Sequence, residues 1–180
     1  MVGMRTKRIF VGLTLIAAVA AAGWALGSGE RPASQPLRAH NFKFEDINPA
    51  SPTHGQSLEL SRLYSEKGLV LQFVASWCGP CRKELPDLQE LHAEGAAPIL
   101  LIAADEYGFT EGILVVAERS GLTTPLLFVP EEEATALEAY YDHEILPATY
   151  LIADNGTIVE RHQGVLSKSR LLAAIERRFN

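Results

Sequence analysis

Two cysteines directly follow a short apolar segment, and this arrangement restricts the fold more than any other feature of the chain. The segment, residues 69–74, holds five apolar residues and one glutamine, which is typical of a central strand covered on both faces. Leucines then recur at helical spacing until Gly95, a predicted helix cap. Cys78 and Cys81 are therefore expected on the first turn of a helix that follows a buried strand.

This placement suits thiol chemistry. Unpaired backbone N–H groups and the positive end of the helix dipole stabilise a thiolate at the first sulfur, so Cys78 is the predicted, exposed nucleophile. Cys81, one turn deeper, is predicted to resolve the mixed disulfide. Gly79 is expected to allow a tight turn, and Pro80 is acceptable where its missing N–H has no partner to lose.

The remaining elements alternate strands with helices and end in a hairpin and a final helix. Asn155-Gly156 is the hairpin signal, and Pro86 is expected to kink the helix that carries the cysteines. The order predicts an α/β fold with a mixed central sheet flanked by helices on both faces. The other expected elements are a half-buried strand with Phe42, Phe44 and Ile47, strands at 98–104, 126–129, 148–153 and 157–160, and helices at 110–120, from Glu131 to Tyr141, and from Ser167 onward with Leu171, Leu172, Ile175 and Phe179 inside.

The N-terminus differs in character from the rest. Arg5, Lys7 and Arg8 precede eighteen uncharged residues, 9–26, which is the layout of a secretory signal. The apolar segment is also long enough to span a bilayer, for which about 17 to 20 residues suffice. A signal peptide cleaved near Ala20 or Ala22 and an uncleaved signal anchor both stay open, and the anchor is preferred.

These features divide the chain into three parts. Residues 1–26 are the predicted signal peptide or anchor helix, 27–37 a small, polar, Pro-containing linker, and 38–180 one folded domain. Positive charge before the apolar segment keeps the N-terminus in the cytoplasm. We therefore expect a bacterial inner-membrane protein whose domain faces the periplasm, or a soluble periplasmic protein if the segment is cleaved.

Composition excludes several classes of function. Without its basic start the chain keeps 22 acidic against 13 basic residues, a net charge of about −9, and no basic, aromatic-interleaved surface appears, so nucleic-acid binding is not expected. An exported protein normally uses cysteines as structural crosslinks, but this pair closes too short a loop. Half of a zinc site is the alternative for such a pair. Its other ligands are missing, because no further cysteine exists and the five histidines are scattered singly.

The active-site residues carry a family resemblance. Trp77-Cys78-Gly79-Pro80-Cys81 resembles the active-site motif of the thioredoxin superfamily. The next five residues, Arg-Lys-Glu-Leu-Pro, are similar to the C-x-x-C-x-x-E-x-P pattern of membrane-anchored TlpA- and ResA-like proteins. The resemblance covers about residues 38–179 and implies a thioredoxin-like fold that exchanges thiols and disulfides without a cofactor.

The resemblance also assigns roles to individual residues. Glu84 lies three residues after Cys81, so a helix places both on one face, and in the family this glutamate handles protons. Gln72 stands where thioredoxin itself carries a buried acid, which leaves Glu84 as the expected proton carrier. Pro147 matches the cis-proline that faces the disulfide.

Client contacts are expected around that proline and the cysteine motif. The position before the proline contacts partners, and Leu146 departs from the Thr or Val of many relatives. The expected client-binding residues are Trp77, Gly79, Pro80 and Leu146.

The resemblance implies a reductase of extracytoplasmic proteins. Gly-Pro between the cysteines is similar to reducing members of the superfamily. In the family such reductants draw electrons from a CcdA- or DsbD-like membrane protein and act on disulfide-bearing clients, usually apocytochrome c. Two alternatives remain: a peroxiredoxin-like peroxidase, although the Thr-x-x-Cys setting is missing, and a copper chaperone of the Sco type, although the cysteine spacing is one residue short.

Overall fold

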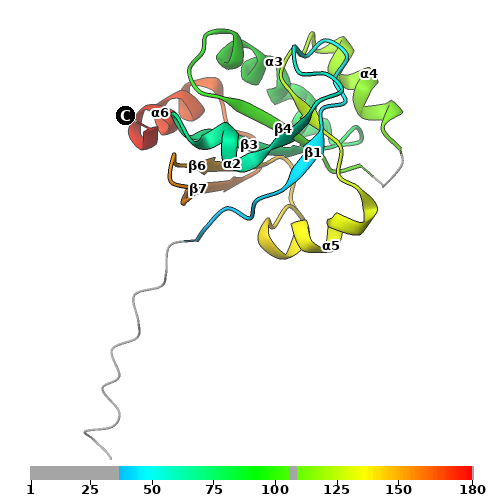
Figure 1. Ribbon diagram of the computed structural model, residues 1–180. Coiled ribbons are helices and arrows are strands. Elements are labelled where there is room, and N and C mark those ends of the chain that lie inside the picture. The colour runs from blue at the N-terminus through cyan, green and yellow to red at the C-terminus, as the bar shows by residue number, and fades with distance from the viewer. Residues whose placement is uncertain (1–36, 106–108, 180) are drawn as a thin grey trace, which may run out of the picture. The chain divides into compact units, whose positions relative to one another are not determined.

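The computed structural model describes residues 37–105 and 109–179, and these form a five-stranded sheet in the order β5-β4-β3-β6-β7 with a separate β1-β2 pair (Figure 1). Strand β3 pairs in parallel with β4 and antiparallel with β6, so the mixed sheet predicted from the sequence is confirmed. The strands are β1 (Lys43–Glu45), β2 (Ser57–Glu59), β3 (Leu69–Val74), β4 (Ile99–Ala103), β5 (Leu126–Leu127), β6 (Ala148–Ile152) and β7 (Ile158–Gln163). The helices are α2 (Leu60–Tyr64), α3 (Gly79–Ala93), α4 (Glu111–Arg119), α5 (Glu131–Tyr140) and α6 (Lys168–Phe179).

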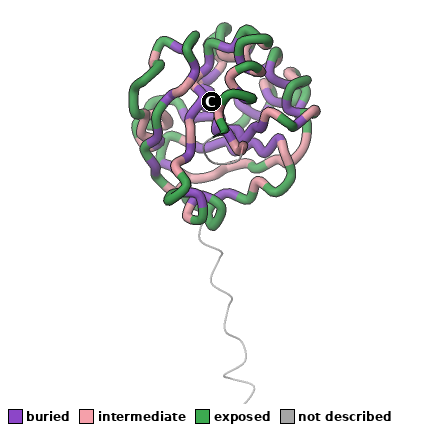
Figure 2. The backbone as a smooth tube through the Cα atoms, turned by 90° about the vertical axis from the view of Figure 1, so that its right-hand side faces the viewer, coloured by how far each residue is buried: buried purple, intermediate pink, exposed green. Residues whose placement is uncertain are grey.

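Each face of the central sheet buries its own apolar cluster. Val70 and Val74 of β3 pack with helices α3, α4 and α6, whereas Leu69, Leu71 and Phe73 pack with β1, α2 and α5. The split follows from the two-residue period of a strand, which points successive side chains to opposite faces. Buried segments therefore run through the interior of the domain while exposed ones form its periphery (Figure 2). The predicted covering of both faces by helices is confirmed.

The N-terminal strand differs from the prediction at its end. Phe42 and Phe44 point inward as expected, but the alternation continues to Asp46, which is fully buried, while Ile47 is only half-buried. Asp46 is tolerated inside because its carboxylate accepts hydrogen bonds from the Leu126 N–H at 3.1 Å and from the Thr53 hydroxyl at 2.7 Å. A buried polar group needs such partners, and the bond from Leu126 fastens the segment to β5.

Other elements also depart from the sequence prediction in detail, among them β7, which was expected at 157–160 and spans Ile158–Gln163. The strand expected at 126–129 pairs only at Leu126–Leu127. In α6 the inner stripe is Leu171, Ala174 and Ile175, because i, i+3 and i+4 positions share one helix face. Leu172 and Phe179 lie at its margins and are only partly buried. Pro86 lies within α3, whose helical residues run without interruption from Gly79 to Ala93.

The described residues do not include the predicted membrane segment. None of the helices within the described residues is long and apolar enough to cross a membrane. The predicted signal or anchor at 1–26 and all but the last residue of the linker lie outside the described residues. The three-part division of the chain therefore stays a prediction.

Candidate redox-active site

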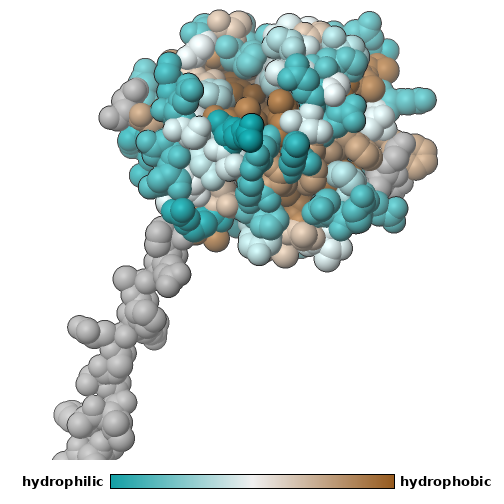
Figure 3. Space-filling model, viewed as in Figure 1, coloured by the Kyte–Doolittle hydropathy of each residue, from teal (hydrophilic) through white to brown (hydrophobic). Residues whose placement is uncertain are grey.

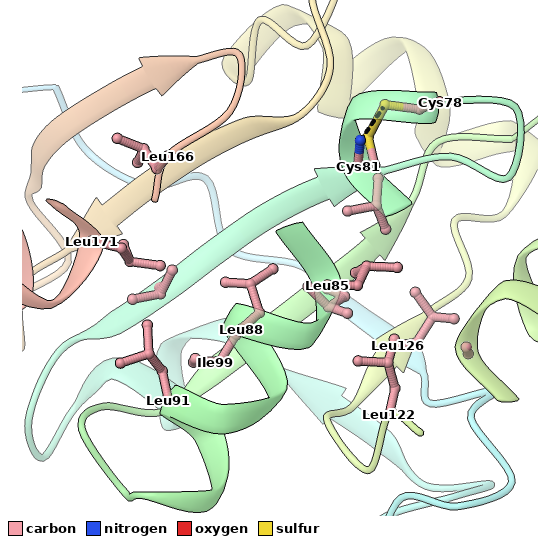
Figure 4. Close-up of a cluster of buried hydrophobic side chains, with 14 of the residues drawn as sticks. Cys78, Cys81, Leu85, Leu88, Leu91, Ile99, Leu122, Leu126, Leu166 and Leu171 are labelled. Carbon is pink, nitrogen blue, oxygen red and sulfur yellow. Dashed lines mark hydrogen bonds between the residues drawn. A yellow bond between two sulfur atoms is a disulfide. The ribbon is translucent and has the colours of Figure 1, made fainter. Parts of the chain in front are cut away.

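The two cysteines form a disulfide at the start of α3. Cys78 is the residue that caps the helix, and its sulfur accepts the Cys81 backbone N–H at 3.1 Å (Figure 4). Their Cα atoms lie 5.3 Å apart. A sulfur that already receives a helix N–H is placed where a thiolate is stabilised after reduction. The geometry therefore suits reversible opening and closing of the disulfide.

Two expectations about this motif are wrong in the disulfide form. Cys78 was expected to be exposed, yet it is only 3% exposed, because it packs with Val74, Cys81 and Leu85 in the apolar cluster under α3. Gly79 was expected to serve a tight turn. Its φ is not positive, and a Cβ there would meet only the Arg82 Nη2 at 3.8 Å, so the backbone would accept a larger residue.

A carboxylate from the neighbouring strand holds the loop before the cysteines. Asp105 follows β4, and both of its oxygens accept the Ser76 N–H at 3.0 Å, while the Ser76 hydroxyl donates to the same carboxylate. Arg82 then donates to the Ser76 carbonyl at 2.6 Å. Charge-assisted bonds of this kind are stronger than neutral ones, so the loop reaches Cys78 with its backbone fixed.

Glu84 lies one turn further along α3 and is almost completely buried. It is 1% exposed, and its Oε1 accepts a long hydrogen bond of 3.4 Å from the Leu166 N–H. Its pKa is raised to about 7: burial is the main cause, the Leu166 N–H and the Gln72 amide oppose it in part, and the nearby Asp87 adds a smaller increase. Because Glu84 and Cys81 share one buried helix face, the carboxyl can exchange protons near neutral pH close to the inner sulfur.

The cis-proline segment lies beside the active-site loop. The Leu146–Pro147 peptide bond is cis, and Pro147 itself is buried. Leu146 and Trp77 line one groove of about 400 Å³, which His143 and Glu138 also line. Trp77 is 67% exposed and Ile145 is also exposed. The structure thus brings the predicted client-contact residues Trp77 and Leu146 to one surface, with Pro80 exposed and Gly79 half-buried nearby on α3.

Comparison with known proteins assigns the family. The family model described as Redoxin matches residues 38–175. The chain belongs to the Redoxin family. It is 33% identical over 174 residues to the thiol-disulfide oxidoreductase ResA of Oceanobacillus iheyensis, covering 93% of this chain and 86% of that protein. With its cysteine pair, it is a thiol–disulfide oxidoreductase of the ResA type.

Solved structures agree on the fold. A thiol:disulfide interchange protein of the thioredoxin family from Chlorobium tepidum superposes with a TM-score of 0.66 at 22% identity, over 82% of this chain and 99% of that one. A secreted Mycobacterium tuberculosis disulfide oxidoreductase gives 0.60 at 20% identity, over 76% and 95%. The thioredoxin-like fold inferred from the sequence motif is confirmed for this Redoxin-family chain.

The sequence analysis missed Asp105, which holds the active-site loop. Asp105 carries a recognisable signal, because a polar residue directly after a strand that is parallel to β3 lies at the same edge as the cysteines. His143 was not missed: its nearness to Pro147 in the sequence suggested that it lines the groove, which it does, and its ring stacks on Phe73 with centroids 4.6 Å apart.

The surface of this Redoxin-family domain is mainly polar. Hydrophilic side chains dominate the face seen in Figure 3, with apolar side chains between them toward its middle. Across the described residues, no group of three or more His, Cys, Asp or Glu side chains is arranged to hold a metal ion.

Proposed function

We propose that this oxidoreductase reduces disulfides in extracytoplasmic client proteins, with electrons supplied by a membrane dithiol protein of the CcdA or DsbD type. The observation that carries the proposal is the Cys78–Cys81 disulfide at the start of α3 with the buried Glu84 one turn beyond it. Gly79-Pro80 between the cysteines places no additional positive charge beside the thiolate, which favours a reductant over an oxidant of the DsbA type.

The reaction begins with the dithiol. The Cys78 thiolate attacks one sulfur of the client disulfide, that S–S bond breaks, and the other client sulfur leaves and takes a proton. Cys81 then gives its proton to the Glu84 carboxylate and attacks the Cys78 sulfur. The mixed disulfide breaks, and the second client sulfur leaves as a thiolate and is protonated. The client gains two electrons and two protons, and the Cys78–Cys81 disulfide is formed.

The client is bound across the groove beside the disulfide. Trp77 and Ile145 offer exposed apolar surface, Leu146 lines the groove, and the backbone beside Pro147 pairs with an extended client segment. Apocytochrome c, presenting a disulfide before haem attachment, is the proposed client. The signal-like segment at 9–26 and the secreted nature of the Mycobacterium tuberculosis neighbour support a site outside the cytoplasm, with the chain anchored in the inner membrane.

Trapping of clients tests this function. Full-length chain with Cys81→Ser is expected to accumulate mixed disulfides through Cys78, because no second sulfur resolves them. The matched Cys78→Ser chain is expected to trap none, although it carries the same number of thiols. Both variants are expressed with their own N-terminal segment, and adducts are separated on non-reducing gels after acid quenching. Equal trapping by both variants, or by neither, would contradict the proposal.

A further inference from the structure

Four buried polar atoms below the disulfide have no hydrogen-bond partner. They are Gln72 Nε2, Gln72 Oε1, Glu84 Oε2 and Thr149 Oγ1. Among the described residues, no other buried side-chain nitrogen or oxygen lacks a partner. All three residues are at most 1% exposed. Native structures satisfy the large majority of such groups, so a set of four in one region calls for an explanation.

The three side chains converge from three elements on one side of the sheet. Gln72 of β3 and Thr149 of β6 are direct partners in the antiparallel ladder, so their side chains leave the same face as neighbours. That face is the one covered by α3, because the flanking Val70 and Val74 pack against Cys81 and Leu85. Glu84 enters from α3, and the Gln72 amide lies close enough to lower its pKa, although its geometry falls short of a hydrogen bond in the disulfide form.

The four atoms are chemically complementary. The Thr149 hydroxyl is a donor and Gln72 Oε1 an acceptor, while Gln72 Nε2 is a donor and Glu84 Oε2 an acceptor. Two hydrogen bonds, from Thr149 to Gln72 and from Gln72 to Glu84, would pair all four and leave none over. We propose that Gln72 and Thr149 are positioning residues for proton transfer: the Gln72 amide binds the Glu84 carboxylate when it ionises, and Thr149 holds the amide in the donating orientation.

The cluster acts on Glu84 without adding charge. β3 places the neutral Gln72 near Glu84, the neutral Thr149 of β6 lies beside Gln72, and the acidic group that acts on Glu84 is Asp87 of its own helix. Asp87 accepts the Lys168 N–H at 3.0 Å, and the Lys168 ammonium is held by Glu90 and Glu94. A hydrogen bond from the Gln72 amide to the Glu84 carboxylate favours the ionised form of Glu84. This is the form that can accept the Cys81 proton.

Isosteric removal of the hydroxyl tests the proposal, which rests on the proposed role of Glu84. In the full-length chain, the pH dependence of Cys81 attack on a Cys78–glutathione mixed disulfide is measured for Thr149→Val and Gln72→Leu. In both variants, the midpoint of this pH dependence is expected to rise by about one pH unit relative to the wild type. At pH 7 the ionised fraction of Glu84 would fall from about one half to about one tenth, so the rate would fall about fivefold.

Stability separates this role from a structural one. Removing an unpartnered hydroxyl is expected to leave the Tm of the disulfide form unchanged or raise it by about 2–4 °C. The matched control is Thr124→Val, equally buried, whose hydroxyl donates to Gln89 at 3.1 Å; its Tm should fall while the pH midpoint stays fixed. Thr149→Ser, which keeps the hydroxyl, should restore the wild-type midpoint.

The outcomes distinguish the two levels of the argument. If Glu84→Gln leaves the pH profile unchanged, the proposed proton acceptor is wrong. If Glu84→Gln abolishes the pH dependence near neutral pH but Thr149→Val and Gln72→Leu do not shift its midpoint, only the positioning role is wrong. In the Glu84→Gln background, Thr149→Val should change nothing further, and an equal shift there would also overturn the proposal.

Discussion

Replacing Glu84 by glutamine should stabilise the folded disulfide form, and only at high pH. Burial raises the pKa of Glu84 from 4.5 to about 7, so the folded chain binds this proton more tightly than the unfolded chain. The stabilising contribution of the protonated carboxyl is complete below the unfolded pKa and is lost as the pH rises through the folded pKa. A difference of about 2.5 pKa units corresponds to about 3 kcal/mol.

The glutamine variant keeps the shape of the protonated acid and cannot ionise. Its free energy of unfolding should match that of the wild type within about 1 kcal/mol at about pH 5, and exceed it by about 3 kcal/mol at about pH 8.5. For a domain of this size the second difference corresponds to a Tm increase of about 6–12 °C.

Urea unfolding of the full-length disulfide form, followed by circular dichroism at both pH values, measures the effect. Burial also lowers the pKa of His92, but this residue is common to both chains and its contribution cancels in the difference. A difference between the chains that does not change with pH would refute the conclusion that Glu84 is buried with a raised pKa.

Two further predictions concern the active-site loop. Asp105→Ala removes the acceptor for the Ser76 N–H and hydroxyl, and should lower the free energy of unfolding by about 1–3 kcal/mol and slow glutathione disulfide reduction. Asp154→Ala, at an exposed turn, is the control, and equal effects of the two substitutions would contradict the conclusion that Asp105 holds the active-site loop. Gly79→Ala should leave Tm unchanged or slightly raised, since a helical glycine is less favourable than alanine by about 0.5–1 kcal/mol and the position is uncrowded; a clear fall in Tm on thermal unfolding would show that the glycine is required.

The fold was predictable because its signals are local and agree with one another. The apolar segment 69–74, the cysteine motif and the Asn155-Gly156 turn each specify one element, and their order specifies a mixed sheet. The exceptions are positions whose burial depends on contacts with a segment distant in the sequence. Asp46 is buried because the backbone of Leu126 supplies a donor, and no local pattern reveals that partner.

The sequence predicted which residues form the site better than it predicted the burial and the neighbours of those residues. The motif located Cys78, Cys81 and Glu84, but not that Cys78 is buried in the disulfide form. Nor does the sequence show that Thr149 lies beside Gln72, because that contact depends on the register between β3 and β6. Register is a property of the assembled sheet, so the polar cluster becomes visible only in three dimensions.

The equilibrium reduction potential of the Cys78–Cys81 pair tests the proposed reductase most directly. The full-length chain is equilibrated with glutathione or dithiothreitol buffers, and the dithiol fraction is measured by thiol alkylation, with Cys78→Ala as the control that forms no intramolecular disulfide. A client reductase fed from the membrane should have a potential near or below about −250 mV. A potential near about −120 mV, which is that of a strong oxidant, would contradict the account.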